Sequence, residues 1–460
     1  MRIEQDYLGK IELADDCYYG IQSARAKENF AVSDSKLPEI FIKSFAYVKL
    51  ACAKVNIELG YLDEKIGAAI CNSCSEIING KWHEQIVVNP MQGGAGTSTN
   101  MNFNEVIANL ALEKLGLKKG DYETIDPLQH VNLHQSTNDV YPTALKVAIL
   151  FLLKDVEKVT AQLQESLQHK EQEFKDILKL GRTQLQDAVP MTLGMTFGAF
   201  SEAIARDRWR IFKCKERIKT VNLGGTAIGT GLNAPTKYIF KVAEKLRRLT
   251  GLAISRSENL IDSTQNLDPF VEISGMLKAY ATNLLKISSD LRLLTSGPNG
   301  GLGEINLPTV QKGSTIMPGK VNPVIPEMMS QISLKIMAND NTIALVAALG
   351  NLELNQFTPL LTDSILESLQ LLKNGVKIFN DKCIIGIKAN RDKCLENLNQ
   401  SKTLATILVP KLGYEKVEEI MSKAREKNCS IETIIIEDNL LSKEELQKFL
   451  SPNAMYKMGF

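Results

Sequence analysis

Apolar residues recur at alternating spacings of three and four positions through the middle of the chain. One series consists of Ile149, Leu152, Val156, Val159 and Leu163. A second consists of Phe270, Ile273, Leu277, Tyr280, Leu284 and Ile287. This spacing places the apolar side chains along one face of a helix, and a strict alternation of three and four is typical of helices that pack nearly parallel. The pattern therefore predicts a bundle of long helices.

Glycine and proline gather between the periodic segments rather than inside them. The sequence SGPNGG at 296–301 predicts the end of the second helix. Further helices are predicted after Pro190 and after Pro326. Near the C-terminus, Ser442 and Glu445 have the spacing of a capping box and predict the start of a short helix.

These elements predict a mainly all-α protein with three domains, the number that a chain of 460 residues also favours. Residues 1–134 are interpreted as a mostly helical N-terminal domain with loops and one small hairpin near residues 10–20. Residues 135–389 are interpreted as the central domain of long helices. Residues 390–460 are interpreted as a small helical C-terminal domain.

The composition excludes several classes of protein. Apolar residues make up 44% of the chain, and 54 basic against 53 acidic side chains leave a net charge of +1. This balance does not fit a nucleic-acid or membrane-surface protein, which normally carries a patch of one sign. No run of about 18 apolar residues predicts a membrane-spanning helix, and the polar, acidic N-terminus does not resemble a secretory signal. We therefore expect a cytoplasmic protein.

The cysteines and histidines do not predict a metal site. Cys71 and Cys74 form a CxxC motif without a second pair or nearby histidines, which favours buried structural thiols. His130 and His134 lie four apart but lack the glutamate of a zinc-binding helix. The string GTGLNA at 229–234 matches a dinucleotide fingerprint, but no clear strand precedes it, which favours a simple turn. We therefore expect no cofactor and no metal.

Four stretches rich in hydroxyl, amide and glycine residues stand beside the predicted helices. They are MQGGAGTSTNMN (91–102), HQSTND (134–139), GRTQLQDAVP (181–190) and KGSTIMPGKVNP (312–323). Any one of them alone is most simply interpreted as a helix cap. Four together are harder to explain in that way, because hydroxyls and free N–H groups at helix starts also bind carboxylates. With Lys320 added, they predict a site for a small dianion.

The last of these stretches resembles a family signature. GSTIMPGKVNP is similar to the GSSxMPxKxN motif of the fumarase/aspartase superfamily, and the other three stretches match further blocks of that superfamily. Its members are homotetrameric lyases that expel a leaving group from succinyl compounds to give fumarate. The resemblance extends from about residue 2 to the C-terminus, and it implies a three-domain fold whose central bundle of long helices forms the tetramer.

Within the superfamily, the blocks look most like those of the ammonia-lyase branch. YYGIQSARAKENF, HQSTNDVYPTA, GRTQLQDAVPMTLG and KVNPVIPE resemble that branch, whereas the fumarate hydratases usually have GRTHLQDATP and KVNPTQCE. The HPND block of the hydratases is replaced here by DPLQHVN. The chain departs from the ammonia-lyase pattern at Thr315, where a second serine is usual, and at Met195 and Thr196, where Gln-Glu is usual.

The resemblance also implies a reaction and roles for individual residues. The reaction is the reversible anti elimination of ammonia from L-aspartate to give fumarate, through an aci-carboxylate intermediate. Ser314 would be the general base. The substrate would be held by Thr97, Ser136, Thr137 and Thr315 at the β-carboxylate, by Lys320, Asn322 and Thr183 at the α-carboxylate, and by Asn138 and Gln184 at the ammonium group. In the superfamily these residues come from three subunits, so the implied site exists only in the homotetramer.

Two alternatives remain open at the level of the sequence. One is fumarate hydratase or another lyase of the same superfamily. The other is a helical structural protein that kept the fold and lost catalysis, as lens proteins of the superfamily did. The presence of Ser314, Lys320 and Asn322 argues against the structural protein.

Overall fold

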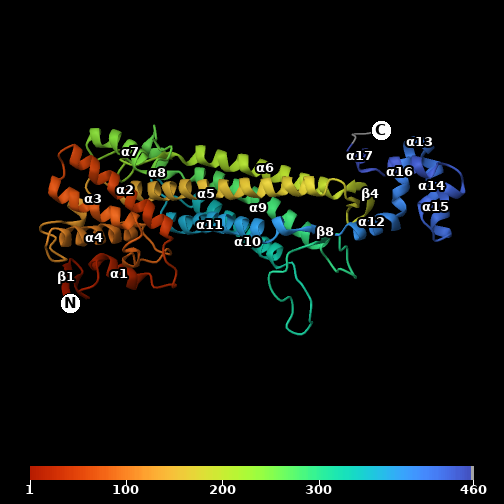
Figure 1. The fold of residues 1–460 in the computed structure, drawn as a ribbon. Helices are drawn as coiled ribbons and strands as arrows, with labels where there is room; N and C mark the ends of the chain where they lie inside the picture. The colour runs from red at the N-terminus through yellow and green to blue at the C-terminus, as the bar shows by residue number, and fades with distance from the viewer. Residues whose placement is uncertain (457–460) are drawn as a thin grey trace. The chain divides into compact units, whose positions relative to one another are not determined.

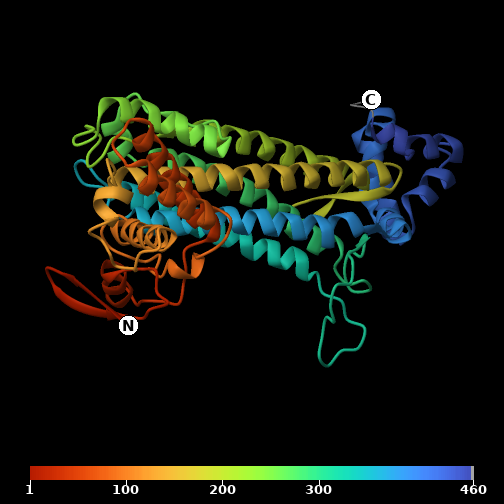
Figure 2. The same ribbon diagram turned by 60° about the vertical axis from the view of Figure 1, so that its left-hand side comes forward.

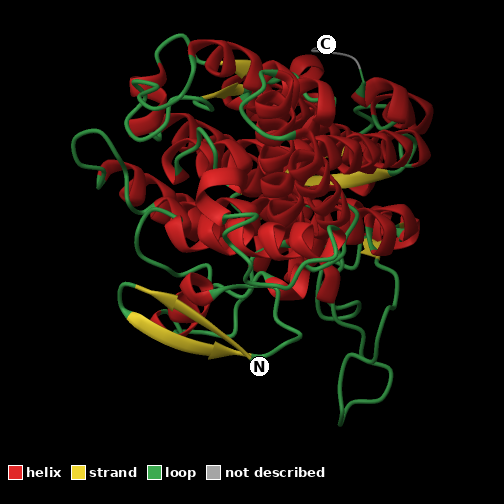
Figure 3. Cartoon of the chain, turned by 90° about the vertical axis from the view of Figure 1, so that its left-hand side faces the viewer, coloured by secondary structure: helices red, strands yellow, loops and turns green. Residues whose placement is uncertain are grey.

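The computed structural model describes residues 1–456, and helices dominate it, with only a few short strands (Figures 1 and 3). The mainly all-α fold class predicted from the sequence is confirmed. The five longest described helices have 25 or more residues each: α5 (Thr137–Glu173), α6 (Leu193–Ile218), α9 (Asp268–Leu294), α10 (Val324–Ala348) and α11 (Thr358–Lys382). None of the described helices has the length and apolar character that a membrane span requires.

The two apolar series of the sequence lie inside these long helices. All residues of the first series are buried in α5, and all residues of the second are buried in α9. Helix α9 ends at Leu294, just before the predicted SGPNGG stop, and α6 begins at Leu193, soon after Pro190. Helix α10 begins two residues before Pro326, which lies in its first turn, where the missing N–H breaks no helical hydrogen bond.

The chain folds into two compact units. Unit 1 consists of Met1–Glu157, Arg210–Ala279 and Lys335–Lys373, and unit 2 consists of Lys158–Trp209, Tyr280–Leu334 and Asn374–Phe460. Each of the five long helices contributes to both units. The division into domains at residues 134 and 389 stays a prediction.

Hydrogen bonds connect the long helices within each unit. In unit 1, Ser274 Oγ of α9 donates to Asp340 Oδ1 of α10 over 2.8 Å. In unit 2, Tyr280 OH of α9 donates to Thr160 Oγ1 of α5 over 3.1 Å. The helices therefore pack through buried polar pairs as well as through their apolar faces.

Unit 1 contains the shorter helices of the N-terminal half. Its regular elements are β1 (Arg2–Asp6), β2 (Gly9–Leu13), α1 (Ile21–Asn29), α2 (Glu39–Glu58), α3 (Glu64–Ile78), α4 (Thr97–Lys114), β5 (Thr220–Val221), α7 (Thr236–Thr250), β6 (Ser255–Arg256) and α8 (Leu260–Gln265). Two short helical turns, His83–Gln85 and Pro127–Val131, complete it.

The N-terminal hairpin lies earlier in the chain than the sequence analysis predicted. Strands β1 and β2 pair antiparallel, with Arg2 opposite Leu13, so the hairpin ends before most of the predicted range. The guanidinium of Arg2 donates to the carbonyls of Cys17 (2.6 Å) and Tyr19 (2.7 Å). These bonds satisfy two carbonyls of the following segment without a strand partner, which is compatible with a loop there.

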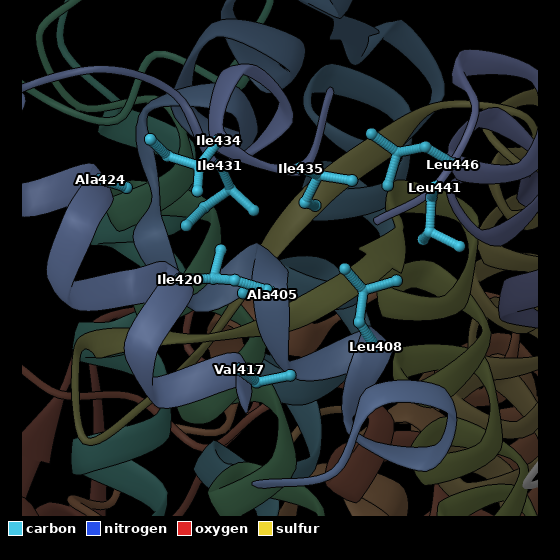
Figure 4. Packing of buried hydrophobic residues seen from close by; sticks show 10 residues of the cluster. All are labelled: Ala405, Leu408, Val417, Ile420, Ala424, Ile431, Ile434, Ile435, Leu441 and Leu446. Atoms are coloured by element: carbon cyan, nitrogen blue, oxygen red, sulfur yellow. The ribbon is translucent and has the colours of Figure 1, made fainter. Parts of the chain in front are cut away.

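Unit 2 contains a second hairpin and the C-terminal helices. Its shorter elements are β3 (Leu178–Thr183), β4 (Gln186–Thr192), β7 (Ile305–Asn306), β8 (Lys388–Ala389), α12 (Arg391–Gln400), α13 (Val409–Leu412), α14 (Tyr414–Glu426), α15 (Ile431–Glu437), α16 (Lys443–Phe449) and α17 (Pro452–Met455), with short turns at Ile384–Gly386 and Lys402–Leu408. The predicted capping box opens α16: Ser442 Oγ accepts from Glu445 N, and the Glu445 carboxylate accepts from Ser442 N. The last helices enclose their own small apolar core (Figure 4).

Candidate active site

A tight turn precedes helix α4 and determines where Thr97 lies. Gly94, Ala95 and Gly96 all have positive φ angles, of 81°, 56° and 93°. A Cβ atom on Gly96 would lie 2.2 Å from the ring of Tyr141, so only glycine fits there. The turn places Thr97 at the first position of α4, where its exposed hydroxyl donates to the Gly94 carbonyl over 2.8 Å.

The start of α5 lies against the first turns of α4. Asn100, one turn into α4, donates from Nδ2 to Thr137 Oγ1 over 3.2 Å. Ser136 Oγ accepts from the backbone N–H of Asn138, also over 3.2 Å. Neither hydroxyl donates a hydrogen bond within residues 1–456, so both hydroxyl protons are available to a ligand. The structure thus brings the two helix starts that carry Thr97, Ser136 and Thr137 into one region of unit 1.

A buried carboxylate fixes the turn that begins α5. Asp139 is fully buried, and its oxygens accept from the backbone N–H groups of Ser136 (3.0 Å), Gly224 (3.1 Å) and Thr226 (3.1 Å). Burial raises the pKa of Asp139 to about 7, although the three N–H donors act in the opposite direction. No spacing rule in the sequence predicts this role for Asp139.

The side chain of Asn138 is oriented by the same neighbouring loop. Its Nδ2 donates to the Ala227 carbonyl over 2.7 Å, and the backbone carbonyl of Asn138 accepts from Asn222 Nδ2 over 2.9 Å. With the amide nitrogen held in this way, Oδ1 is left as an acceptor. An acceptor at this position suits an ammonium group.

A buried lysine is connected by hydrogen bonds to the starts of α4 and α5. Lys49 is fully buried in α2, and its Nζ donates to Asn132 Oδ1 (3.0 Å) and Gln135 Oε1 (2.9 Å). Asn132 Oδ1 also accepts from Asn100, the residue that contacts Thr137. Burial lowers the pKa of Lys49 to about 8, so the side chain is still charged at neutral pH. A cation inside an apolar helix is the sequence signal by which this residue could have been found.

Thr183 and Gln184 lie at the tip of the β3–β4 hairpin, which the sequence analysis did not predict. Thr183 pairs with Gln186, and Gln184 and Leu185 form a two-residue turn with φ angles of 54° and 62°. Such turns normally contain Asn-Gly or other residues that adopt positive φ easily. Because Gln184 and Leu185 are not residues of this kind, the sequence does not predict the hairpin. The positive φ angle of Gln184, a predicted site residue, also means that its backbone is strained.

The loop between β7 and α10 extends away from the long helices (Figure 2). Its two strands of chain are joined at Gly313, Lys320 and Asn322, which we call the neck. Gly313 N donates to the Lys320 carbonyl over 3.0 Å, and Asn322 Nδ2 donates to the Gly313 carbonyl over 2.6 Å. A Cβ atom on Gly313 would lie 2.2 Å from the Lys320 carbonyl oxygen, so the neck requires glycine. The ammonium group of Lys320 is exposed and makes no ion pair within residues 1–456.

Ser314 lies just beyond the neck, in a setting that favours negative charge on its oxygen. Its Oγ accepts from the backbone N–H groups of Ile316 (3.2 Å) and Met317 (3.0 Å). Two N–H donors stabilise an alkoxide more than a hydroxyl and therefore favour loss of the proton. Ile316 is 84% exposed, which leaves an apolar loop tip in contact with solvent.

The predicted site residues thus form three groups. The first, in unit 1, consists of Thr97, Ser136, Thr137 and Asn138. The second, at the hairpin tip of unit 2, consists of Thr183 and Gln184. The third, in the loop of unit 2, consists of Ser314, Thr315, Lys320 and Asn322. A cavity of about 760 Å³ lies beside the loop and is lined by Lys320, Asn322 and by Arg292, which the sequence analysis did not single out.

The other sequence motifs have structural roles in the part of the chain that is described. GTGLNA forms turns between the two-residue strand β5 and helix α7, and Gly229 packs directly against Ile261. His134 bonds to Asn56, and His130 accepts from the backbone N–H of Asp126. All eight cysteines are free thiols, and no three His, Cys, Asp or Glu side chains gather as metal ligands within residues 1–456.

Two family models match the chain. The model described as Lyase matches residues 9–338, and the model described as Fumarase C C-terminus matches residues 404–457. The chain therefore belongs to the fumarase/aspartase superfamily of lyases.

Its similar relatives include aspartate ammonia-lyases. That of Helicobacter pylori is 46% identical over 457 residues, which are 99% of this chain and 98% of the relative. That of Bacillus subtilis is 45% identical over 458 residues, which are 100% and 96% of the two proteins. A crystal structure titled fumarate lyase:delta crystallin from Brucella melitensis, bound to cobalt, has a TM-score of 0.95 and 44% identity, and the match covers 99% of this chain and all of that one.

Proposed function

We propose that this chain is an aspartate ammonia-lyase, which eliminates ammonia from L-aspartate reversibly and in the anti sense to give fumarate, without a cofactor. Relatives of that name match nearly its whole length at 45–46% identity. The structural observation that carries the proposal is Ser314, whose Oγ accepts from two backbone N–H groups in a loop that also carries the exposed cation Lys320.

The difficult step of this reaction is removal of a proton from the carbon next to the β-carboxylate. The product of that step is an aci-carboxylate with two negative charges, so a catalyst must place donors before the charge develops. The hydroxyls of Thr97, Ser136, Thr137 and Thr315 supply such donors in this proposal. Ser136 and Thr137 are suited to it because their oxygens already accept hydrogen bonds from the protein.

Ser314 is the general base in this proposal. A serine hydroxyl loses its proton only where the alkoxide is stabilised, and the N–H groups of Ile316 and Met317 provide that stabilisation. The exposed apolar tip favours closure of the loop over bound substrate, because closure would cover Ile316 and remove water from the serine.

The remaining groups of the substrate need a cation and acceptors. Lys320 and Asn322, with Thr183, bind the α-carboxylate in this proposal; one N–H of Asn322 is used at the loop neck, and the other remains for the ligand. Asn138 Oδ1 and the Gln184 side chain accept from the ammonium group. The glutamine at 184 favours the ammonia-lyase over a fumarate hydratase, whose usual residue there is histidine.

We further propose that the protein acts as a cytoplasmic homotetramer in which three subunits contribute to each site. The three groups of site residues lie on separate elements, and large apolar side chains are exposed along the long helices. These include Phe212 of α6, Leu293 of α9, and Leu334 and Leu345 of α10, all more than 40% exposed. Exposed apolar side chains of this size on helices favour burial against another subunit.

A direct test follows the ultraviolet absorbance of fumarate. The purified protein should form fumarate from L-aspartate and only slowly from malate. Comparable rates with malate would favour the fumarate hydratase. No fumarate from either substrate would favour the structural protein.

A further inference from the structure

A buried carboxylate outside the proposed site is paired with two cations of strand β3. Glu304 is fully buried, and its Oε1 lies 2.7 Å from Arg182 Nη1. Its Oε2 lies 3.1 Å from Nζ of the buried Lys179, which is an ion pair by distance but not a hydrogen bond. Asn397 Nδ2 also donates to Oε1, over 3.3 Å. Removing one partner from a buried ion pair leaves a charge without compensation, so such a cluster holds its members firmly in place.

The backbone of Glu304 is fixed independently of its side chain. Its N–H donates to the Leu294 carbonyl at the end of α9 over 2.8 Å, and its carbonyl accepts from Asn390 N over 2.9 Å. The next residue, Ile305, pairs with Ala389 in the β7–β8 ladder. A substitution that changes only the side chain therefore leaves this framework, and the start of the Ser314 loop, in place.

The backbone hydrogen bonds between β3 and β4 are irregular close to the hairpin tip, so a side-chain contact is needed there to hold β3 in position. The register of β3 against β4 shifts between Leu180 and Arg182, which interrupts the regular ladder just before Thr183. Beyond the irregularity, Gln184 and Leu185 form the strained turn. Within residues 1–456, Arg182 is thus the last residue before the tip whose side chain bonds to another part of unit 2.

We propose that Glu304 is a positioning residue for the reaction: by holding Arg182 and Lys179 it sets where Thr183 and Gln184 face the substrate. This inference rests on the proposed function. In the proposed function the α-carboxylate is bound by Lys320 and Asn322 as well as by Thr183, and the Ser314 loop that carries these two residues keeps its backbone framework. The ammonium group depends more on Gln184, so loss of the Glu304 carboxylate should impair recognition of ammonia more than recognition of fumarate.

The reverse reaction separates these two effects, because ammonia and fumarate are then separate substrates. In Glu304→Gln we expect the KM for ammonium to rise by about 10-fold or more, and the KM for fumarate to change by less than about 3-fold. Circular dichroism and the oligomeric state should match the wild type. The matched control is Glu396→Gln, which removes the exposed partner of Lys393 (3.0 Å) on α12 of the same unit and should leave both KM values unchanged.

A second variant covers the case in which Glu304→Gln does not fold. Arg182→Gln removes the other half of the pair and should raise the KM for ammonium in the same selective way. If both variants fold, the double variant should be no worse than the worse single one, because each removes the same interaction.

The contrary results are distinct. An unchanged KM for ammonium in a folded Glu304→Gln or Arg182→Gln variant, with only a lower melting temperature, would leave the cluster a purely structural role and overturn the inference. Equal increases in both KM values would overturn it as well. A wild type that forms no fumarate from L-aspartate would overturn the proposed function itself, and this inference with it.

Discussion

The helix starts of unit 1 and the loop of unit 2 carry similar residue types but are built in opposite ways. At the start of α5, the proposed binding residues are held by buried groups, among them Asp139 and the Asn100 amide. In the loop, the hydrogen bonds that hold the segment around Ser314 to a fixed point within residues 1–456 are those of the neck between Gly313 and Lys320, and the tip is exposed. In the proposed function, the donors for the β-carboxylate would therefore be placed in advance, whereas the base would reach the substrate when the loop closes.

The largest effect should follow from removing the base. Ser314→Ala should lower kcat by about 10²–10⁴-fold or more, because general base catalysis is lost. The free energy of unfolding should change by less than about 0.5 kcal/mol, because the side chain lies in an exposed loop. Steady-state kinetics and urea unfolding measure the two quantities. The control is Gln311→Ala, which changes an exposed side chain just outside the neck. Substantial activity in Ser314→Ala would mean that another group is the base.

The opposite pattern is expected at the start of α5. Asp139→Ala should lower the free energy of unfolding by about 3 kcal/mol, because three buried N–H groups lose their acceptor. Asp155→Ala removes an exposed carboxylate from the same helix and should have little effect. A stability loss for Asp139→Ala no greater than that of the control would contradict the difference drawn between the two regions.

The raised pKa of Asp139 predicts a pH dependence. In the unfolded chain this carboxyl ionises near 3.8, and in the folded protein near 7. Its protonation therefore stabilises the fold fully below about pH 4, and this contribution is lost as the pH rises through about 7. Asp139→Asn cannot ionise, so the stability of the wild type relative to this variant should fall between pH 4 and pH 7. Urea midpoints over that range measure it, and a constant difference would contradict the shift.

The smallest effect concerns the hairpin tip. Leu185→Gly should raise the free energy of unfolding by up to about 1 kcal/mol, because glycine adopts the positive φ at this position without strain. Thermal unfolding measures the change. A lower stability would show that the turn carries less strain than its φ angles indicate.

The long helices could be predicted because their signal is local. The three-four series of α5 and α9 needs only the spacing of apolar residues, and the capping box at Ser442 needs only two residues of the right type. The residues Ser136, Thr137 and Ser314 could be singled out because hydroxyl clusters beside helices are also local. Their roles rest on resemblance to a family and stay a proposal.

The buried charges could not be predicted in the same way. The side-chain partners of Lys49, Asp139 and Glu304 lie 83 or more residues away in the sequence. The one local bond among them is that between Asp139 and the N–H of Ser136. No spacing rule connects such pairs. The β3–β4 hairpin was missed for a different reason, because Gln-Leu is not a residue pair that normally forms a two-residue turn.

The central claim is that residues of different subunits complete each site. Lys320→Ala and Ser136→Ala should each be inactive alone. When the two variants are mixed so that subunits exchange, random assembly should leave about a quarter of the sites with neither change. Activity should therefore return partly, with the wild-type KM for L-aspartate.

The matched control mixes Ser136→Ala with Thr137→Ala. These neighbours lie on one turn of one chain, so every copy of that turn carries a change, and no wild-type site can form. The measurement is the rate of fumarate formation in each mixture after subunit exchange. We predict recovery for the first mixture and none for the second; no recovery in the first, with exchange of subunits demonstrated, would contradict the shared site.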